Sequence, residues 1–212
     1  MGREDNDWTG VDTIAKIYDG KCTTHTGALR LLKDGTGKEN FLLTASHYLK
    51  YFVGKTILVI GCSIGNEVWA YKENGFDPFG MDISKFAIDN AMPEVKDRCV
   101  VADIRYVTVG QCDNVAAFDV LEHIPDIELE QSLINCRKMT KKVFVARIPS
   151  YYNEKFFHYD VKDIKSEHMI TESVEFWDKQ ITNVFKPTEW NKLIEKPTKD
   201  NWWIYRYERI EL

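Results

Sequence analysis

The segment from Ile57 to Asn66 constrains the fold more than any other part of this 212-residue chain. An apolar run of strand length leads directly into Gly61 and Gly65, and a segment with helical periodicity follows at once. A buried strand, a tight glycine turn and a helix N-terminus in succession allow a backbone to approach a bound ligand closely. The pattern therefore predicts a ligand crevice at the end of this strand.

Strand-like and helical segments alternate along the rest of the chain. Apolar runs predict strands at Thr56–Ile60, Pro78–Met81, Arg98–Ala102, Asn114–Val120, Lys142–Ile148 and Asn201–Ile210. Helical patterns lie at Glu39–Val53, Asn66–Asn74, 84–91 with Ser84 as its cap, Ile127–Met139 and Glu172–Ile181. Such alternation predicts an α/β protein with an open, mainly parallel sheet and helices on both faces.

Composition excludes several classes of protein. No apolar run approaches the roughly eighteen residues that a membrane span needs, and the polar N-terminus lacks a signal core, so we expect a cytoplasmic protein without membrane contact. Five cysteines, widely spaced and without a Cys-x-x-Cys pair, predict reduced, mostly buried thiols. They form neither a disulfide framework nor a zinc ligand set, and we expect no metal site.

Charge is distributed unevenly along the chain. Residues 136–212 carry 15 basic and 12 acidic side chains, whereas residues 1–135 carry 13 basic and 21 acidic ones. An acidic N-terminal part suits a cationic ligand, and the chain lacks the stripe of Lys and Arg that grips a phosphate backbone. We therefore expect no nucleic-acid partner.

Three aspartates lie where apolar runs end. Asp82 follows Gly65 by 17 residues, at the place where an acid accepts hydrogen bonds from both ribose hydroxyls of an adenine nucleoside. Its alternative role is to cap the helix that begins near Ser84. Asp103 could accept the adenine amino proton while the backbone N–H of Ile104 donates to a ring nitrogen, or it could be a plain surface acid. The third is Asp119.

Asp119 lies in a motif that resembles a known family. The segment Phe118-Asp-Val-Leu-Glu-His-Ile-Pro125 is similar to the motif after strand four of class I S-adenosylmethionine-dependent methyltransferases. Three further segments match that family in order and spacing: Val59-Ile-Gly-Cys-Ser-Ile-Gly65, Gly80-Met-Asp82 and Val101-Ala-Asp103. The resemblance covers about residues 40–150 well. It implies a Rossmann-like sheet of seven strands in the order 3-2-1-4-5-7-6, with the last strand antiparallel.

The resemblance also implies a cofactor, a domain organisation and a set of site residues. The chain would be a single domain, 1–212, with an N-terminal extension (1–38), a cofactor-binding half (39–150) and a substrate-side half (151–212). S-adenosylmethionine, converted to S-adenosylhomocysteine, would lie over the glycine turn, with its ribose on Asp82, its adenine on Asp103 and its sulfonium near Asp119. The implied cofactor-binding residues are Ile60, Gly61, Cys62, Ser63, Gly65, Asp82, Ile83, Asp103, Ile104, Asp119, Val120 and Leu121.

Two positions depart from the family pattern. Val59 stands where the family usually has an acid, two residues before the first motif glycine, and Ser63 replaces the middle glycine. Losing the acid removes one anchor for the cofactor's amino group, and Ser63 costs stability if its φ must be positive. A binding module that holds S-adenosylmethionine or S-adenosylhomocysteine without transfer is therefore the alternative. A nicotinamide-dependent oxidoreductase is disfavoured because the third glycine of the dinucleotide fingerprint is missing.

The acceptor is less constrained by sequence than the cofactor. His123, His168 and Tyr151 are the candidate catalytic residues, with His158 and Tyr152 as further possibilities. The segment Arg147-Ile-Pro-Ser-Tyr-Tyr152 lacks the Asn/Asp-Pro-Pro-Tyr pattern of enzymes that methylate nucleobase or glutamine amino groups. We therefore expect O- or N-methylation of a small molecule by a monomer or homodimer.

Overall fold

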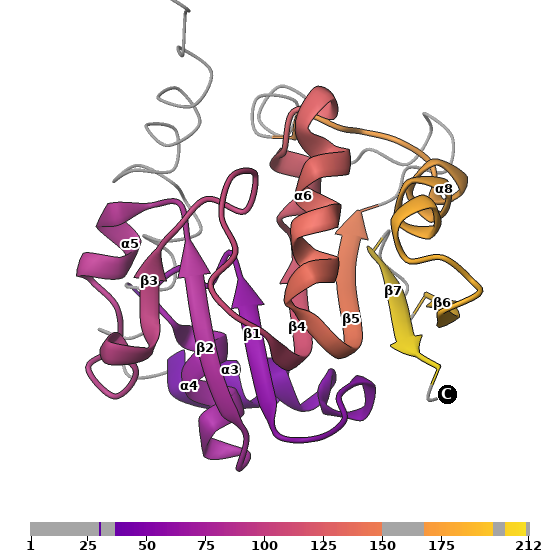
Figure 1. Cartoon of the computed structure of the whole chain (residues 1–212). Helices are drawn as coiled ribbons and strands as arrows, with labels where there is room; N and C mark the ends of the chain where they lie inside the picture. Colours follow the sequence, from indigo (N-terminus) through magenta and orange to yellow (C-terminus); the bar gives the residue numbers. More distant parts are fainter. Residues whose placement is uncertain (1–29, 31–36, 150–167, 197–201, 211–212) are drawn as a thin grey trace, which may run out of the picture.

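A computed structural model describes residues 30, 37–149, 168–196 and 202–210 of the chain (Figure 1). Its strands form a seven-stranded sheet in the order β3-β2-β1-β4-β5-β7-β6. They are β1 (Thr56–Ile60), β2 (Asp77–Asp82), β3 (Cys99–Val101), β4 (Cys112–Phe118), β5 (Thr140–Pro149), β6 (Trp190–Glu195) and β7 (Trp202–Arg209). Strands β1 to β5 pair in parallel, and β7 runs antiparallel to both β5 and β6. The predicted strand order and antiparallel last strand are confirmed.

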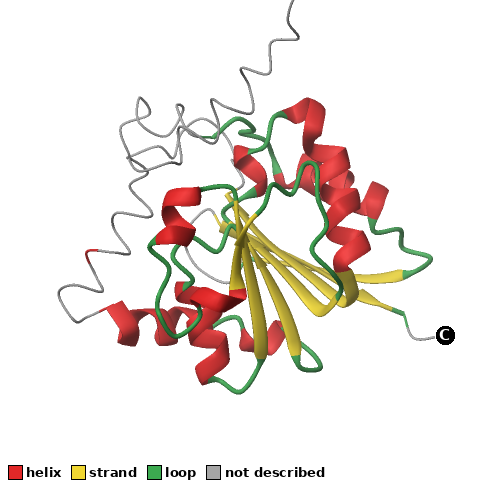
Figure 2. Ribbon diagram, turned by 60° about the vertical axis from the view of Figure 1, so that its left-hand side comes forward, coloured by secondary structure: helices red, strands yellow, loops and turns green. Residues whose placement is uncertain are grey.

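Helices cover both faces of this sheet (Figure 2). They are α3 (Gly37–Ser46), α4 (Asn66–Glu73), α5 (Lys85–Asp89), α6 (Asp126–Met139) and α8 (Val174–Val184). Ser84 caps α5 by accepting a hydrogen bond from the Ala87 N–H, and Ser173 caps α8 in the same way from Phe176. Ser84 was expected as a cap from the sequence, and Ser173 was one of two candidates for the second cap, the other being Thr171.

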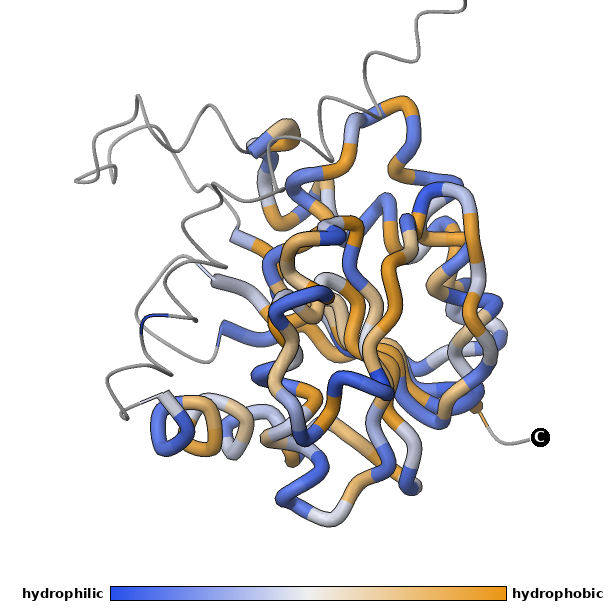
Figure 3. The backbone as a smooth tube through the Cα atoms, turned by 90° about the vertical axis from the view of Figure 1, so that its left-hand side faces the viewer, coloured by the Kyte–Doolittle hydropathy of each residue, from blue (hydrophilic) through white to orange (hydrophobic). Residues whose placement is uncertain are grey.

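The alternation of residues along β1 separates two hydrophobic cores. Ile57 and Val59 pack into the core under α3 and α4, which contains Phe41, Val68 and Trp69. Leu58 and Ile60 pack into the opposite core, under α6 and α8. Because every residue from Ile57 to Ile60 is buried, the strand reads as a continuous apolar run. Figure 3 shows hydrophobic residues, in orange, along the central strands.

The structure corrects three element predictions. The helix expected over Glu39–Val53 ends at Ser46, and a short 3₁₀ turn, η1 (Leu49–Tyr51), follows it. The strand expected over Asn114–Val120 ends at Phe118, because Asp119 has a φ of 58° and turns the chain out of the sheet. Strand β6 was not recognised from the sequence: it lies at the edge of the sheet, and three of its six residues are exposed, so it shows no apolar run.

Other expectations can be compared only in part. The four described cysteines are free and buried, as predicted, and Cys22 lies outside the described residues. No helix in the described part of the chain is long and apolar enough to cross a membrane. Most of the expected N-terminal extension, and the segment 150–167 at the start of the expected substrate-side half, also lie outside the described residues.

Candidate functional site

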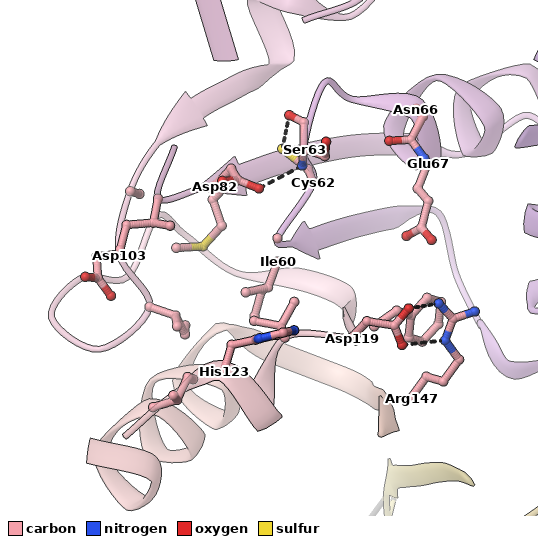
Figure 4. Close-up of a pocket in the computed structure, with 18 of the residues that line it drawn as sticks. Ile60, Cys62, Ser63, Asn66, Glu67, Asp82, Asp103, Asp119, His123 and Arg147 are labelled. Atoms are coloured by element: carbon pink, nitrogen blue, oxygen red, sulfur yellow. Dashed lines mark hydrogen bonds and ion pairs between the residues drawn. The ribbon is translucent and has the colours of Figure 1, made fainter. Parts of the chain in front are cut away.

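A pocket with a volume of about 600 Å³ lies at the carboxyl ends of β1, β2 and β4 (Figure 4). This edge is where open parallel sheets bind ligands, and the volume is in the range of small-molecule sites. Most of the predicted site residues line it: Ile60, Gly61, Cys62, Ser63, Asp82, Ile83, Asp103, Ile104, Asp119, Val120, His123 and His168. Segments between Ile60 and His168 thus meet around one cavity.

Three predicted site residues are not among those that line the pocket. Gly65 is the residue before α4, with a φ of 78°, and an added Cβ would lie about 3 Å from the side chains of Val95 and Cys99. Its role in the structure is therefore to allow the turn and close packing. Leu121 is fully buried in the core under α6 and α8. Tyr151, like Tyr152 and His158, lies outside the described residues.

The turn after β1 is held in an unusual backbone conformation. Gly61 has a φ of 71°, and an added Cβ would lie 2.3 Å from Cγ2 of Val120, so a side chain there would collide with the loop after β4. Ser63, in place of the family's middle glycine, has a φ of 50°, a region that side chains disfavour. Its backbone N–H donates a 2.8 Å hydrogen bond to Oδ2 of Asp82, which helps to hold the strained residue.

Asp82 connects two loops at the pocket. Besides the bond from Ser63, its Oδ1 accepts a 2.8 Å hydrogen bond from the backbone N–H of Ser84. The two readings of Asp82 are therefore compatible, because the carboxylate ties down the start of α5 while the residue also lines the pocket. A carboxylate oxygen can accept more than one hydrogen bond, so capacity for a ribose hydroxyl remains.

Asp103 is fixed by an ion pair. Both of its carboxylate oxygens accept hydrogen bonds from Arg105. The Arg105 side chain is 4% exposed and also donates from Nη1 to Glu128 Oε2 at 2.7 Å. The plain surface-acid reading of Asp103 does not fit this geometry. Arg105 was not singled out from the sequence, since its partner Glu128 lies 23 residues away on α6.

Asp119 is fixed in the same manner from the far side of the pocket. Arg147 on β5 donates from Nε to Asp119 Oδ1 at 2.8 Å and from Nη2 to the other carboxylate oxygen. The third guanidinium nitrogen donates to the hydroxyl of Tyr48 at 2.6 Å. Arg147 was also missed from the sequence, although an arginine near the end of a nearly all-apolar strand is a usable signal.

Glu67 is a further carboxylate at the pocket that was not predicted from the sequence. It lies in the first turn of α4, partly buried, and lines the pocket. No described residue donates a hydrogen bond to it, and Figure 4 shows its carboxylate directed into the pocket toward Asp119. Burial raises the pKa of Glu67 to about 7, with Arg147 opposing the rise and Asp119 adding to it. The sequence feature that could have identified Glu67 is an acid in the first helical turn after a glycine loop.

Glu122, His123 and His168 form a cluster beside the pocket. Glu122 and His123 belong to the 3₁₀ turn η3 (Leu121–His123), and the backbone carbonyl of Glu122 accepts hydrogen bonds from Met169 and Ile170, which brings His168 alongside. The two imidazole rings lie 4.8 Å apart at 75°. The Glu122 side chain is fully buried, and neither carboxylate oxygen has a hydrogen-bond partner among the described residues.

Comparison by sequence finds no matching family model and no matching curated protein. Comparison by structure finds many solved relatives of the fold. Magnesium protoporphyrin IX methyltransferase from Synechocystis, solved with S-adenosylhomocysteine, is 15% identical with a TM-score of 0.60, over 96% of this chain and 95% of its own. A putative methyltransferase solved with the Haloferax volcanii Trm112 activator is 14% identical with a TM-score of 0.64, over 88% and 97%.

The small RNA methyltransferase HEN1 is a third similar structure. It is 14% identical with a TM-score of 0.62, over 82% of this chain and 25% of its own. These proteins differ in what their names say they act on or assemble with, so their shared property is the fold. The strand order, the antiparallel β7 and these matches together show that this chain has the fold of the class I S-adenosylmethionine-dependent methyltransferases.

Proposed function

We propose that this protein is an S-adenosylmethionine-dependent methyltransferase that acts on a small-molecule acceptor. The observation that carries the proposal is the convergence of the glycine turn, Asp82, Asp103 and Asp119 on one pocket of about 600 Å³. Solved relatives of the same fold hold S-adenosylhomocysteine or S-adenosylmethionine, which supports the choice of cofactor.

The adenosine part of the cofactor would lie along the rim formed by β2 and β3. Asp82 would accept hydrogen bonds from the ribose hydroxyls, and Asp103 with Ile104 would hold the adenine edge. Both carboxylates are already fixed by donors in the protein. Little side-chain entropy would therefore be lost when the nucleoside binds.

The methionine part would lie between the glycine turn and Asp119. Glu67 would bind the ammonium group there, replacing the anchor that the family's usual acid provides and that Val59 lacks. Val59 itself is buried in the core under α3 and α4, and α4 carries Glu67 over the same face of the sheet. Ionised Glu67 faces a pocket with no described donor to it, so a cationic group is a suitable partner.

The chemical step would be an in-line displacement at a methyl group that the sulfonium has already activated. The protein's main contribution is to align the acceptor, which can be worth roughly 7–11 kcal/mol. His123 and His168 lie on the pocket wall beside Val120 and Ile124, where an acceptor would approach. The net charge of −5 and the acidic pocket wall disfavour a phosphate backbone, so a small molecule is proposed in preference to a nucleic acid.

Calorimetric titration with S-adenosylmethionine and S-adenosylhomocysteine tests the cofactor, and transfer of labelled methyl to a metabolite panel tests the reaction. We expect micromolar affinity and transfer to at least one metabolite. Affinity without transfer would favour the non-catalytic binding module, for which the strained Ser63 and the valine at position 59 are the motivation. Absence of nucleoside binding would refute the proposal.

A further inference from the structure

The cluster of Glu122, His123 and His168 places three potential metal ligands together. One carboxylate oxygen and one nitrogen from each imidazole all lie within 4.8 Å of one another. A single cation bonded to three ligands at about 2.0–2.2 Å would hold them at separations of about 3–4 Å. Only small side-chain rotations would therefore close the cluster around an ion.

Glu122 supplies an independent observation that a partner belongs here. Its side chain is 0% exposed, and within the described residues neither oxygen accepts a hydrogen bond. Burying a polar group without a partner costs several kcal/mol, so such groups are rare in native proteins. Nε2 of His123 lies 3.9 Å from Oε1, too far for a hydrogen bond. A bound cation would satisfy the carboxylate that the protein leaves without donors.

The donor set and its position indicate the class of ion. Two imidazoles and one carboxylate suit a divalent first-row metal such as Zn²⁺, Mn²⁺ or Fe²⁺ and leave coordination positions open. Glu122 is buried behind the cluster, whereas His123 and His168 line the pocket. Figure 4 shows the His123 ring directed into the pocket. The open positions would therefore face the space for the acceptor.

We propose that Glu122, His123 and His168 bind a divalent metal ion whose open coordination positions hold a hydroxyl oxygen of the methyl acceptor. The metal site replaces the expectation from the sequence that the chain has none. It also changes the role of the two histidines from candidate proton acceptors to metal ligands. A nitrogen that coordinates a metal cannot accept the acceptor's proton.

The acceptor part of this inference rests on the proposed function. A metal-bound hydroxyl has a lowered pKa and releases its proton to solvent water. The oxygen's electron pair then forms the new C–O bond to the methyl carbon while the S–C bond breaks. The electrons of the broken bond stay on sulfur, which leaves neutral S-adenosylhomocysteine. The substrate class is thus an alcohol, a phenol or a diol.

The metal site is tested on the full-length chain after treatment with EDTA, by calorimetric titration with Zn²⁺ and, separately, Mn²⁺, with no nucleoside present. We expect one ion per chain. Glu122→Gln and His168→Ala should each weaken binding by at least about tenfold. His47→Ala is the matched control, because His47 is exposed on the chain and outside the cluster. Its affinity should equal that of the unmodified chain.

Thermal unfolding checks that the variants are folded. Saturating Zn²⁺ should raise the melting temperature of the unmodified chain and of His47→Ala, but not of Glu122→Gln or His168→Ala. The inference is overturned if the unmodified chain binds neither ion, or if both cluster variants bind as tightly as the control does.

These experiments distinguish a failure of the metal-site inference from a failure of the proposed function. A chain that binds S-adenosylmethionine but neither ion would keep the proposed function and lose this inference. A chain that binds Zn²⁺ or Mn²⁺ but no nucleoside would keep the metal site and lose the proposed function. Methyl transfer to a hydroxyl that EDTA abolishes and the ion restores supports the acceptor assignment, whereas transfer that is insensitive to EDTA overturns it.

Discussion

The two sides of the pocket treat their carboxylates differently. On the β2 and β3 side, Asp82 accepts hydrogen bonds from two backbone N–H groups, and Asp103 accepts them from Nε and Nη2 of Arg105. On the other side, Arg147 pairs with Asp119 in the same way, but Glu67 in the pocket and Glu122 behind its wall have no hydrogen-bond donor among the described residues. The first pair is preorganised for recognition by shape and hydrogen bonding. The second pair lacks donors in the protein, and a cationic ligand would supply the missing partner.

This difference has a thermodynamic meaning. A carboxylate with donors stabilises the fold whether or not a ligand is present. A buried carboxylate without donors destabilises the empty protein and gains more when a cation arrives. The nucleoside side should therefore respond to mutation in both stability and affinity. The opposite side should respond mainly in binding and in its dependence on pH.

The largest expected effect is at Gly61, where the two sides meet. Gly61→Ala combines a positive φ with a contact of 2.3 Å to Val120, and should destabilise the fold by about 2–4 kcal/mol. Gly75→Ala is the matched control: Gly75 has a φ of 86° with nothing within 4 Å, so strain alone should cost about 1 kcal/mol. Urea unfolding measures both, and equal losses would mean that Val120 does not press on the turn.

The next effect is at Asp82. Asp82→Ala should weaken S-adenosylmethionine binding by about 1.5–3 kcal/mol and also lower stability, because the N–H groups of Ser63 and Ser84 lose their acceptor. Asp82→Asn keeps one carbonyl oxygen and should lose less of both. Calorimetry and thermal melting provide the measurements. Unchanged affinity in Asp82→Ala would remove the ribose assignment.

Asp103 should show a smaller version of the same behaviour. Asp103→Ala leaves the buried Arg105 paired with Glu128 alone, so we expect a loss of about 1–2 kcal/mol in stability together with weaker nucleoside binding. The loss of stability could not be predicted from the sequence, because Arg105 was not recognised as the partner of Asp103. Adenosine binding that is unaffected while stability falls would assign Asp103 a structural role.

The smallest effect, and the sharpest contrast with the nucleoside side, is the pH dependence of Glu67. Its pKa of about 7 in the folded protein exceeds the usual 4.5. The folded protein therefore has its full stability from neutral Glu67 below pH 4.5 and loses this contribution as the pH rises through about 7. Glu67→Gln should therefore raise the melting temperature near pH 8 and leave it unchanged near pH 4.5.

Binding provides the second readout for Glu67. In the unmodified chain, S-adenosylmethionine affinity should rise between about pH 6 and pH 8, as Glu67 ionises opposite the ammonium group. Glu67→Gln should remove that dependence and bind about tenfold more weakly near pH 8. An identical pH profile in the two proteins would show that Glu67 does not contact the cofactor.

The sequence predicted the elements that depend on local pattern. Thr56–Ile60 was recognised with its observed bounds because a buried parallel strand is apolar on both faces. Strand β6 was missed because it is an edge strand that, among the described strands, pairs only with β7. Polar residues are tolerated at such an edge, so β6 shows no apolar run. The end of β4 was placed two residues late because Asp119 turns the chain through a φ that sequence does not specify.

By itself, the sequence determined the glycine turn and the acids at the strand ends. It therefore also determined which edge of the sheet forms the site, because parallel strands bring their carboxyl ends to one edge. The tertiary structure decided which of those acids have partners. Arg147 and His168 reach the site from segments distant in sequence, on β5 and before α8. Arg105 lies only two residues after Asp103, but its second partner, Glu128, comes from α6. Local patterns encode period and turn, whereas the partner of a buried charge is set by long-range packing.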